Sequence, residues 1–216
     1  MQIGVLGSGV VGQTLGTGFA ARGHQVMMGT RDPAGEKVTA WRESAGAGAS
    51  VGTFADTAAF AELAVLATSW TGTEQALQLA GAERLAGKVL IDVTNPLDFS
   101  HGAPPGLALG HTDSGGEQVQ RWLPGARVVK ALNIIGAPYM VDPSFAEGAP
   151  DMFICGNDDP AKAEVTGILE AFGWRDHITD IGGIEGARLL EPLCILWVVY
   201  GMRTGGWNHA FKLVKN

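Results

Sequence analysis

The sequence predicts an α/β protein built on a doubly wound parallel sheet. Three observations support this fold class. Short apolar runs alternate with helix-like segments along the chain, as they do in sheets with helices on both faces. The first apolar run leads into closely spaced glycines and then into a helical pattern. The 216 residues are 46% hydrophobic and only 17% charged, which is enough apolar material for a sizeable core.

Six short apolar runs, several of them rich in β-branched residues, have the composition of buried parallel strands. They are Gln2–Leu6, Gln25–Met28, Ala64–Ala67, Val89–Val93, Ala126–Leu132 and Met152–Cys155. A last strand is expected within Arg175–Asp180.

Helices are predicted between these strands, and each strand–helix–strand unit is expected to cross over with the right-handed sense. The candidates are Val10–Arg22, Gly35–Ala45, Thr73–Ala80, Gly115–Leu123 and Pro160–Phe172. A further apolar helix is expected over Gly186–Tyr200, before a glycine break at Gly205 and Gly206.

The glycines after the first strand match the pattern GxGxxG at Gly7, Gly9 and Gly12, with Ser8, Val10 and Val11 between them. In this setting the first glycine permits a tight turn and the second lets the backbone approach a pyrophosphate. The third allows close packing of helix and strand. The free N–H groups at the helix start favour anionic phosphates. We therefore predict a Rossmann dinucleotide site.

This reading divides the chain into two parts. Residues 1–180 form the expected Rossmann domain. Residues 181–216 form a small C-terminal helical extension that packs on that domain. The extension is expected to contribute to an acceptor pocket or to a dimer contact, because its apolar positions spread around most of a helix.

The end of the second strand indicates which dinucleotide binds. An NAD site places Asp or Glu there, to accept hydrogen bonds from the ribose hydroxyls. This chain has Thr30 and Arg31 instead, which can bind a 2′-phosphate through charge-assisted hydrogen bonds. Lys37 is a candidate second cation, whereas Asp32 could pair with Arg31 or act as the NAD-type acid. We predict NADP(H).

Two further strand ends are expected to face the cofactor, because ligands of such sheets bind beyond the carboxyl ends of the strands. Thr68, Ser69 and Trp70 follow one strand, and Thr94, Asn95 and Pro96 follow the next. Small hydroxyl and amide groups at these positions suit the ribose and the nicotinamide carboxamide.

Composition excludes several function classes. A net charge of −7 argues against a nucleic-acid or membrane-surface role, since both favour a basic face. Two cysteines are too few for a disulfide framework, and the N-terminus lacks the pattern of a signal peptide, so we expect a cytoplasmic protein with reduced thiols. The five histidines lack any short metal-ligand spacing, and no metal site is expected.

The chain resembles the coenzyme F-420 (deazaflavin)-dependent NADP oxidoreductases and the related cytosolic domain of the STEAP metalloreductases. The resemblance covers nearly all of the sequence. It is carried by GVLGSGVVG, GHQVMMGTR, AVLATSW, VLIDVTNP, VVKALNIIGA, FICGNDD and LLEPLCILWVVYGM, in this order and spacing.

The resemblance implies an NADP-dependent oxidoreductase that transfers hydride between NADPH and a flavin-like acceptor. It assigns Thr30 and Arg31 to the 2′-phosphate, and it makes residues 131–137 the floor of the acceptor pocket, with Asn133 as an orienting residue. Archaeal deazaflavin enzymes are expected to carry histidine at this position, and the NIIGA stretch is closer to the STEAP version. Coenzyme F-420, FMN and FAD are therefore the candidate second substrates, with a quinone or a small carbonyl also open.

The resemblance also places an aromatic set at the mouth of the acceptor cleft. Its members are Trp70, Tyr139, Trp197, Tyr200 and Trp207. Aromatic faces would hold a flat fused ring by stacking. Lys130 lies in an apolar strand just before the expected pocket, where it is either a proton donor or part of a salt bridge.

Two other functions fit the fold. Relatives of β-hydroxyacid dehydrogenases and imine reductases reduce carbonyls or imines, but they carry a large helical second domain. The hydroxyacid dehydrogenases also have a catalytic lysine, which GIEGARLLEPLCIL lacks. An NADPH-binding redox sensor without catalysis is the alternative from another class, because a fold does not determine function. The apolar C-terminal helix further predicts a homodimer.

Overall fold

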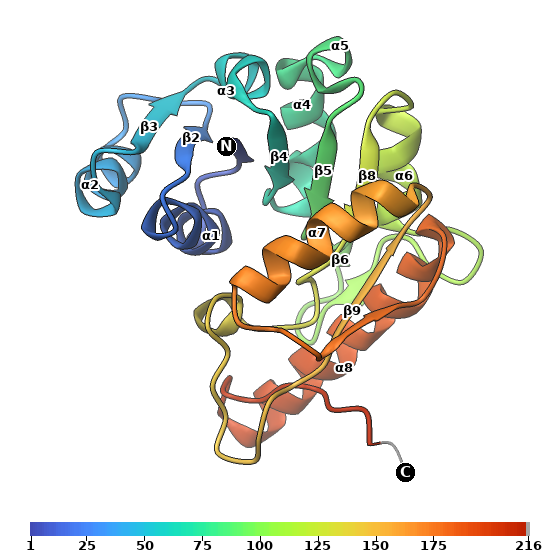
Figure 1. Ribbon diagram of the computed structural model, residues 1–216. Coiled ribbons are helices and arrows are strands. Elements are labelled where there is room, and N and C mark those ends of the chain that lie inside the picture. The colour runs from blue at the N-terminus through green and yellow to red at the C-terminus, as the bar shows by residue number, and fades with distance from the viewer. Residues whose placement is uncertain (215–216) are drawn as a thin grey trace.

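The structure, a computed structural model, describes residues 1–214 and has one central sheet with helices on both faces (Figure 1). The sheet has eight strands in the order β10-β9-β8-β5-β4-β1-β2-β3. Its strands are β1 (Gln2–Leu6), β2 (Gln25–Gly29), β3 (Ala49–Gly52), β4 (Leu63–Leu66), β5 (Val89–Asp92), β8 (Arg127–Lys130), β9 (Met152–Gly156) and β10 (Ile178–Asp180). The predicted fold class is confirmed.

The helices follow the strands closely in the sequence. They are α1 (Val10–Ala21), α2 (Glu36–Ala45), α3 (Phe54–Phe60), α4 (Trp70–Ala80), α5 (Ala82–Leu85), α6 (Gly115–Trp122), α7 (Asp159–Ala171) and α8 (Ala187–Thr204). Two 3-10 turns, Ala137–Tyr139 and Ile184–Gly186, complete the regular structure together with a small hairpin of β6 (Leu97–Asp98) and β7 (Gly106–Leu107).

The alternation of side chains along the strands produces two hydrophobic cores, one on each face of the sheet. Ile3 and Val5 of β1 pack against α1, α2 and α7, whereas Leu6 belongs to the cluster beneath α3, α4, α5 and α6. Successive residues of a strand point to opposite faces, so every central strand must be apolar on both sides.

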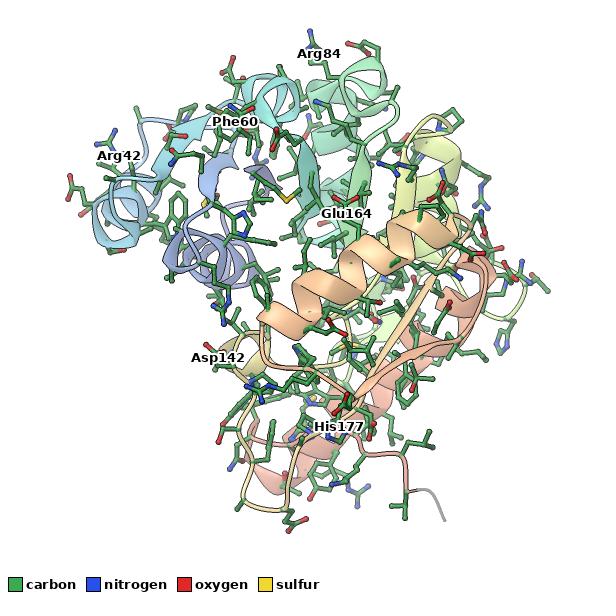
Figure 2. All side chains as sticks on the ribbon, viewed as in Figure 1. Arg42, Phe60, Arg84, Asp142, Glu164 and His177 are labelled. Atoms are coloured by element: carbon green, nitrogen blue, oxygen red, sulfur yellow. The ribbon has the colours of Figure 1, made fainter. Side chains whose placement is uncertain are left out.

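Charged side chains such as Arg42 and Arg84 project from the outer surface (Figure 2).

The sheet departs from the expected all-parallel arrangement at one edge. β9 runs antiparallel to β8, and β10 then pairs parallel to β9. The link between β8 and β9 contains only a 3-10 turn, whereas parallel neighbours need a long crossover, usually an α-helix. Our expectation of a parallel strand at residues 152–155 was therefore wrong in direction, though not in position.

The region 46–62 also holds elements that we did not predict. β3 and α3 lie there, and α3 begins with a capping box in which Thr53 and Asp56 exchange hydrogen bonds. The spacing of a threonine and an acidic residue three positions later is a readable start signal for a helix. The strand itself is short and half-buried, which leaves little periodicity to detect.

Helix α8 is the long helix of the C-terminal extension, and Figure 1 shows it in the lower half of the view, on the opposite side from α2 and α3. It contacts α6 and the β6–β7 hairpin. It ends at Gly205, which has a left-handed φ of +69°, as the expected glycine break requires. Residues 215 and 216 of the predicted extension lie outside the described residues.

Candidate functional site

The chain turns sharply between β1 and α1. Gly7 has a φ of +126°, and a Cβ there would lie 2.4 Å from the carbonyl oxygen of Ala67. A Cβ on Gly12 would lie 2.0 Å from the carbonyl oxygen of Gly7. A side chain at either position would push β1, β4 and α1 apart. Gly9 differs, because a Cβ there would meet no atom within 4 Å beyond its own chain neighbours.

The open space beside Gly9 lies at the N-terminus of α1. Gly9 is the N-cap of this helix, and within residues 1–214 no side chain caps its first N–H groups. The first turn also carries no acidic residue. Free N–H groups and the helix dipole together attract an anion, and the missing Cβ lets a pyrophosphate reach the backbone. The residues present thus fit a dinucleotide.

A groove of about 400 Å³ runs from this turn toward β2, and we call it the Arg31 groove. Its walls are Gly7, Ser8, Gly9, Thr30, Arg31, Phe54, Ala67, Thr68, Ser69, Thr71, Gly72, Gln75, Ala76 and Leu79. The Ser8 hydroxyl donates a hydrogen bond to Thr30 Oγ1 over 3.3 Å. Arg31 is exposed and forms no ion pair with any residue of the described chain. Hydroxyls and a free guanidinium therefore gather where the 2′-phosphate was predicted.

Asp32 and Lys37 occupy different positions relative to this groove. Asp32 Oδ1 accepts a hydrogen bond from the N–H of Ala34 over 3.2 Å, so the carboxylate caps the turn that follows it. Neither Asp32 nor Lys37 is among the lining residues, and Lys37 is exposed in the first turn of α2. Binding of the phosphate by Lys37 would require its long side chain to reach back, and it stays a prediction.

A second groove of about 370 Å³ continues past β4 and β5, and we call it the Asn95 groove. It is lined by Gly9, Val10, Val11, Ala67, Thr68, Ser69, Trp70, Thr71, Val93, Thr94, Asn95, Leu97 and Phe99. Both grooves share Gly9 and the segment from Ala67 to Ser69, so they form one continuous channel across the carboxyl ends of the strands. This is where an open α/β sheet binds its ligand.

Three of the predicted residues shape the Asn95 groove in different ways. Thr68 Oγ1 and Thr73 Oγ1 lie 2.9 Å apart, which fixes the loop before α4. Trp70 stacks on Trp122, with 5.6 Å between the ring centroids. Pro96 is buried outside the lining, and its carbonyl accepts a hydrogen bond from the N–H of Ala108 that holds the β6–β7 hairpin.

Asn133 lies beneath the Asn95 groove rather than in its wall. Its Nδ2 donates to Asn95 Oδ1 over 2.9 Å and to the carbonyl oxygen of Leu190 over 3.1 Å. Asn95 Nδ2 in turn donates to the carbonyl oxygen of Asn133 over 2.8 Å. The two amides form a reciprocal pair, in which Asn95 faces the groove and Asn133 supports it from behind.

Lys130 is fully buried and belongs to a salt-bridge cluster, which is one of the two roles that the sequence left open. Its Nζ lies 3.0 Å from Asp92 Oδ2 and 3.0 Å from Glu191 Oε1. Burial alone would lower the pKa of Lys130, but attraction to these two carboxylates raises it above the ordinary value for lysine. A proton donor needs a pKa near the working pH. Lys130 therefore keeps its proton and is no general acid.

The predicted aromatic set is divided between two places, which corrects our expectation of a single cleft mouth. Of the five predicted aromatic residues, only Trp70 lines the Asn95 groove. Tyr139, Trp197 and Tyr200 line a separate C-terminal cavity of about 670 Å³, between the loop 144–150 and residues 208–212. Trp207 packs against Trp197, with 5.3 Å between the ring centroids. The spacing of aromatics along a helix could not show which side of α8 faces the nucleotide.

Phe54, Phe99 and Glu191 are site residues that sequence reasoning missed. Phe54 starts the unpredicted helix α3 and closes one side of the Arg31 groove. Phe99 follows the β6–β7 hairpin strand and stands 59% exposed at the Asn95 groove. Glu191 lies in an apolar helix, where an almost fully buried carboxylate is itself a signal of a specific partner.

Residues 2–96 match the family described as NADP oxidoreductase, coenzyme F420-dependent. The F420-dependent NADP reductase of Methanothermobacter marburgensis is 31% identical, and the alignment covers 99% of this chain and 98% of that enzyme. This chain belongs to the family of F420-dependent NADP oxidoreductases. It is an NADP-dependent oxidoreductase, and its dinucleotide is NADP(H).

Other relatives extend this result. A solved structure from Arthrobacter sp. FB24, provisionally assigned as an F420-dependent NADP reductase, is 45% identical over all of both chains, with a TM-score of 0.95. Metalloreductase STEAP3 of Rattus norvegicus is 28% identical over 89% of this chain, which spans only 36% of that longer protein. An imine reductase of Streptomyces aurantiacus shares the fold, with a TM-score of 0.67 at 18% identity, and the match covers 64% of its chain.

Three further observations concern metal ligands, membrane spans and thiols. Among residues 1–214, no group of three or more histidine, cysteine or carboxylate side chains is arranged to hold a metal ion. None of the helices in that range has the length and apolar character needed to cross a membrane. Cys155 and Cys194 are both free and buried, and burial raises the pKa of each thiol to about 12.

Proposed function

We propose that this protein transfers hydride between NADPH and a flavin-like ring, with a deazaflavin, FMN or FAD as the acceptor. One observation carries the proposal. None of the residues that line the Asn95 groove within the described chain ionises near neutral pH, because the lining consists of apolar, hydroxyl and amide side chains. Hydride transfer to a flat ring depends on stacking and close approach more than on an acid.

In this proposal each part of the channel holds one part of the cofactor. The turn of Gly7, Gly9 and Gly12 carries the pyrophosphate, while Thr30 and Arg31 bind the 2′-phosphate, with Lys37 as a second cation. Ribose and carboxamide contacts are assigned to Thr68, Ser69, Trp70 and Asn95, while Pro96 borders the nicotinamide from behind the lining. When bound, the nicotinamide supplies the hydride, and the chain's own residues orient it and exclude water.

The acceptor ring would lie against the apolar wall of the Asn95 groove. Val10 and Phe99 stand 72% and 59% exposed at this groove, and such side chains gain by covering a flat ring. Asn133 orients the site through Asn95 and transfers no proton. Relatives named F420-dependent NADP reductase support a deazaflavin, and rat STEAP3 supports a relationship to metalloreductases.

Reduction of a small carbonyl or imine is the second candidate, favoured by the fold likeness to imine reductases. That chemistry places a proton on oxygen or nitrogen, so it calls for a donor near the nicotinamide. Lys130 is a buried cation bonded to the carbonyl of Thr94, a residue of the groove lining, and its two ion pairs with Asp92 and Glu191 hold it away from this role. A non-catalytic sensor would need a closed site, whereas the Asn95 groove is open.

The pH dependence of the reaction separates these candidates. The raised pKa of Lys130 keeps this lysine protonated well above pH 8, so it cannot contribute a limb to the profile at neutral pH. We therefore expect kcat for NADPH oxidation to change little between about pH 6 and 8. A steady-state pH profile with a flavin-like acceptor measures this. A bell-shaped profile would instead indicate acid catalysis and oppose the flavin-like assignment.

We further propose that the protein is a cytoplasmic homodimer with α8 at the interface. Leu189, Leu196, Tyr200 and Met202 of this helix are exposed, and apolar side chains of that size rarely stay in water together. Light scattering at micromolar concentration should give twice the 22.5 kDa mass of one chain. The double variant L189E/L196E should shift the mass to a monomer. A monomeric wild type would show that α8 only closes its own domain.

A further inference from the structure

A buried cluster of three charges lies directly beneath the Asn95 groove. Lys130, at the end of β8, pairs with Asp92 at the end of β5 and with Glu191 in α8. All three side chains have an exposed fraction of 1% or less. Apolar residues of similar volume often stabilise a core as well as a buried ion pair, or better. Stability alone therefore explains this cluster poorly.

The start of α6 is built to accept the cluster. Glu191 accepts hydrogen bonds from the N–H groups of Gly115 over 2.9 Å and Gly116 over 3.0 Å. A Cβ on Gly116 would lie 3.0 Å from Lys130 Cε, and one on Gly115 would lie 3.1 Å from the Trp70 ring. One lysine and two carboxylates leave a net negative charge, which the helix N-terminus offsets. The two glycines make room for the charges and for the groove above them.

The cluster connects to the groove by two routes. In the first, Lys130 Nζ donates to the carbonyl oxygen of Thr94 over 2.7 Å, and Thr94 directly precedes Asn95. In the second, the carbonyl oxygen of Leu190 accepts from Asn133 Nδ2, and Leu190 directly precedes Glu191. The routes meet where Asn95 and Asn133 pair, so β5, β8 and α8 close one ring of contacts at the groove.

This ring fixes how the two amides are oriented. Backbone carbonyls can only accept, so Asn95 must turn its NH₂ toward the Asn133 carbonyl, and Asn133 must turn its NH₂ toward Leu190. Asn95 Oδ1 then has to be the atom that accepts from Asn133. Asn95 keeps one N–H and one oxygen lone pair free, which is the complement of a primary carboxamide.

The backbone beside Asn133 is also held in an unfavourable conformation. Leu132 has a φ of +60°, a left-handed conformation that branched side chains rarely adopt. Its N–H donates to Met152 Sδ over 3.3 Å, and its side chain is buried. Backbone strain of this kind persists only where the surroundings enforce it, and it gathers at functional sites.

We propose that Lys130 and Glu191 are positioning residues, which orient the Asn95–Asn133 amide pair so that it receives the carboxamide of the nicotinamide. Lys130 acts through Thr94, and Glu191 acts through Leu190. The inference rests on the NADP(H) half of the proposed function and not on the identity of the acceptor. It predicts that the two ends of the cofactor depend on different residues. The charged cluster affects binding of the nicotinamide end, whereas binding of the adenosine end in the Arg31 groove does not depend on the cluster.

Binding of two ligands tests this separation. NADPH occupies the whole channel, whereas 2′,5′-ADP carries only the adenosine half with its 2′-phosphate. In Lys130→Met we expect the Kd of NADPH to rise about tenfold or more, while that of 2′,5′-ADP changes less than about twofold. The fluorescence anisotropy of the bound nicotinamide should also fall, because its ring is no longer held.

Glu191→Gln provides a second variant in case Lys130→Met does not fold. It leaves Lys130 and Asp92 as a balanced pair, but the new NH₂ group must face either Lys130 or the N–H groups of α6. The matched control is Lys162→Met. Lys162 is likewise largely buried between two carboxylates, Asp159 and Asp180, on the far edge of the sheet.

The outcomes are distinct. A selective loss of NADPH affinity and anisotropy in the cluster variants, absent from Lys162→Met, supports the positioning role. Equal weakening of both ligands, or unchanged binding in a folded Glu191→Gln, overturns it and leaves the cluster as a purely structural feature. Neither result depends on the acceptor, so failure of the flavin-like assignment would be recognised separately.

Discussion

Replacement of Gly12 by alanine should abolish measurable NADPH binding and destabilise the fold. The new Cβ would lie 2.0 Å from the carbonyl oxygen of Gly7, and that oxygen belongs to backbone that cannot rotate away. Overpacking of this kind typically costs about 1–3 kcal/mol, and more where backbone must move. The shift would displace the glycine turn that carries the pyrophosphate. Thermal unfolding and a titration with NADPH measure both effects.

Gly9→Ala is the matched control for this prediction. Its Cβ meets no protein atom within 4 Å, so the melting temperature should stay within about 2 °C of the wild type. NADPH binding should nevertheless weaken, because the methyl group enters the space assigned to the pyrophosphate. If Gly9→Ala bound NADPH normally, the phosphate would have to lie elsewhere.

Arg31→Ala should weaken NADPH by about 1.5–3 kcal/mol, which is roughly tenfold to a hundredfold in Kd. The guanidinium lines the Arg31 groove and has no carboxylate partner within the described residues, so its charge is available to a phosphate. Binding of NADH should remain nearly unchanged, since it lacks the 2′-phosphate. Quenching of tryptophan fluorescence can report both titrations.

Two further variants calibrate this result. Arg42→Ala removes an exposed arginine on α2 that lines neither groove, and it should leave both affinities unchanged (Figure 2). Lys37→Ala tests the predicted second cation and should show a smaller loss than Arg31→Ala. Equal affinity of the wild type for NADPH and NADH would contradict the role of Thr30 and Arg31.

The nucleotide half of the site could be predicted from the sequence because its signals are local. Gly7, Gly9 and Gly12 act within one turn, and the bounds of β1 agree with the predicted strand at both ends. Thr30 and Arg31 follow directly from the end of β2. Steric and electrostatic demands of that kind are met by residues adjacent in sequence, so a single chain displays them.

The other half depends on contacts between distant elements. Lys130 meets Asp92 and Glu191 only after β5, β8 and α8 have assembled, so its two possible roles could not be separated beforehand. The division of Trp70 from Trp197 depends on which face of α8 packs inward. Tertiary packing decides such questions, and helical spacing alone does not.

The most direct test of the central claim is the choice of hydride acceptor. At saturating NADPH, the consumption of NADPH should be followed with coenzyme F420, FMN and FAD, and in parallel with a quinone, a small carbonyl and a cyclic imine. We expect a flat flavin-like ring to be reduced with a kcat/KM at least about a hundredfold above that of the carbonyl and the imine. A preference for the carbonyl or the imine, with an acid-dependent rate, would contradict the account.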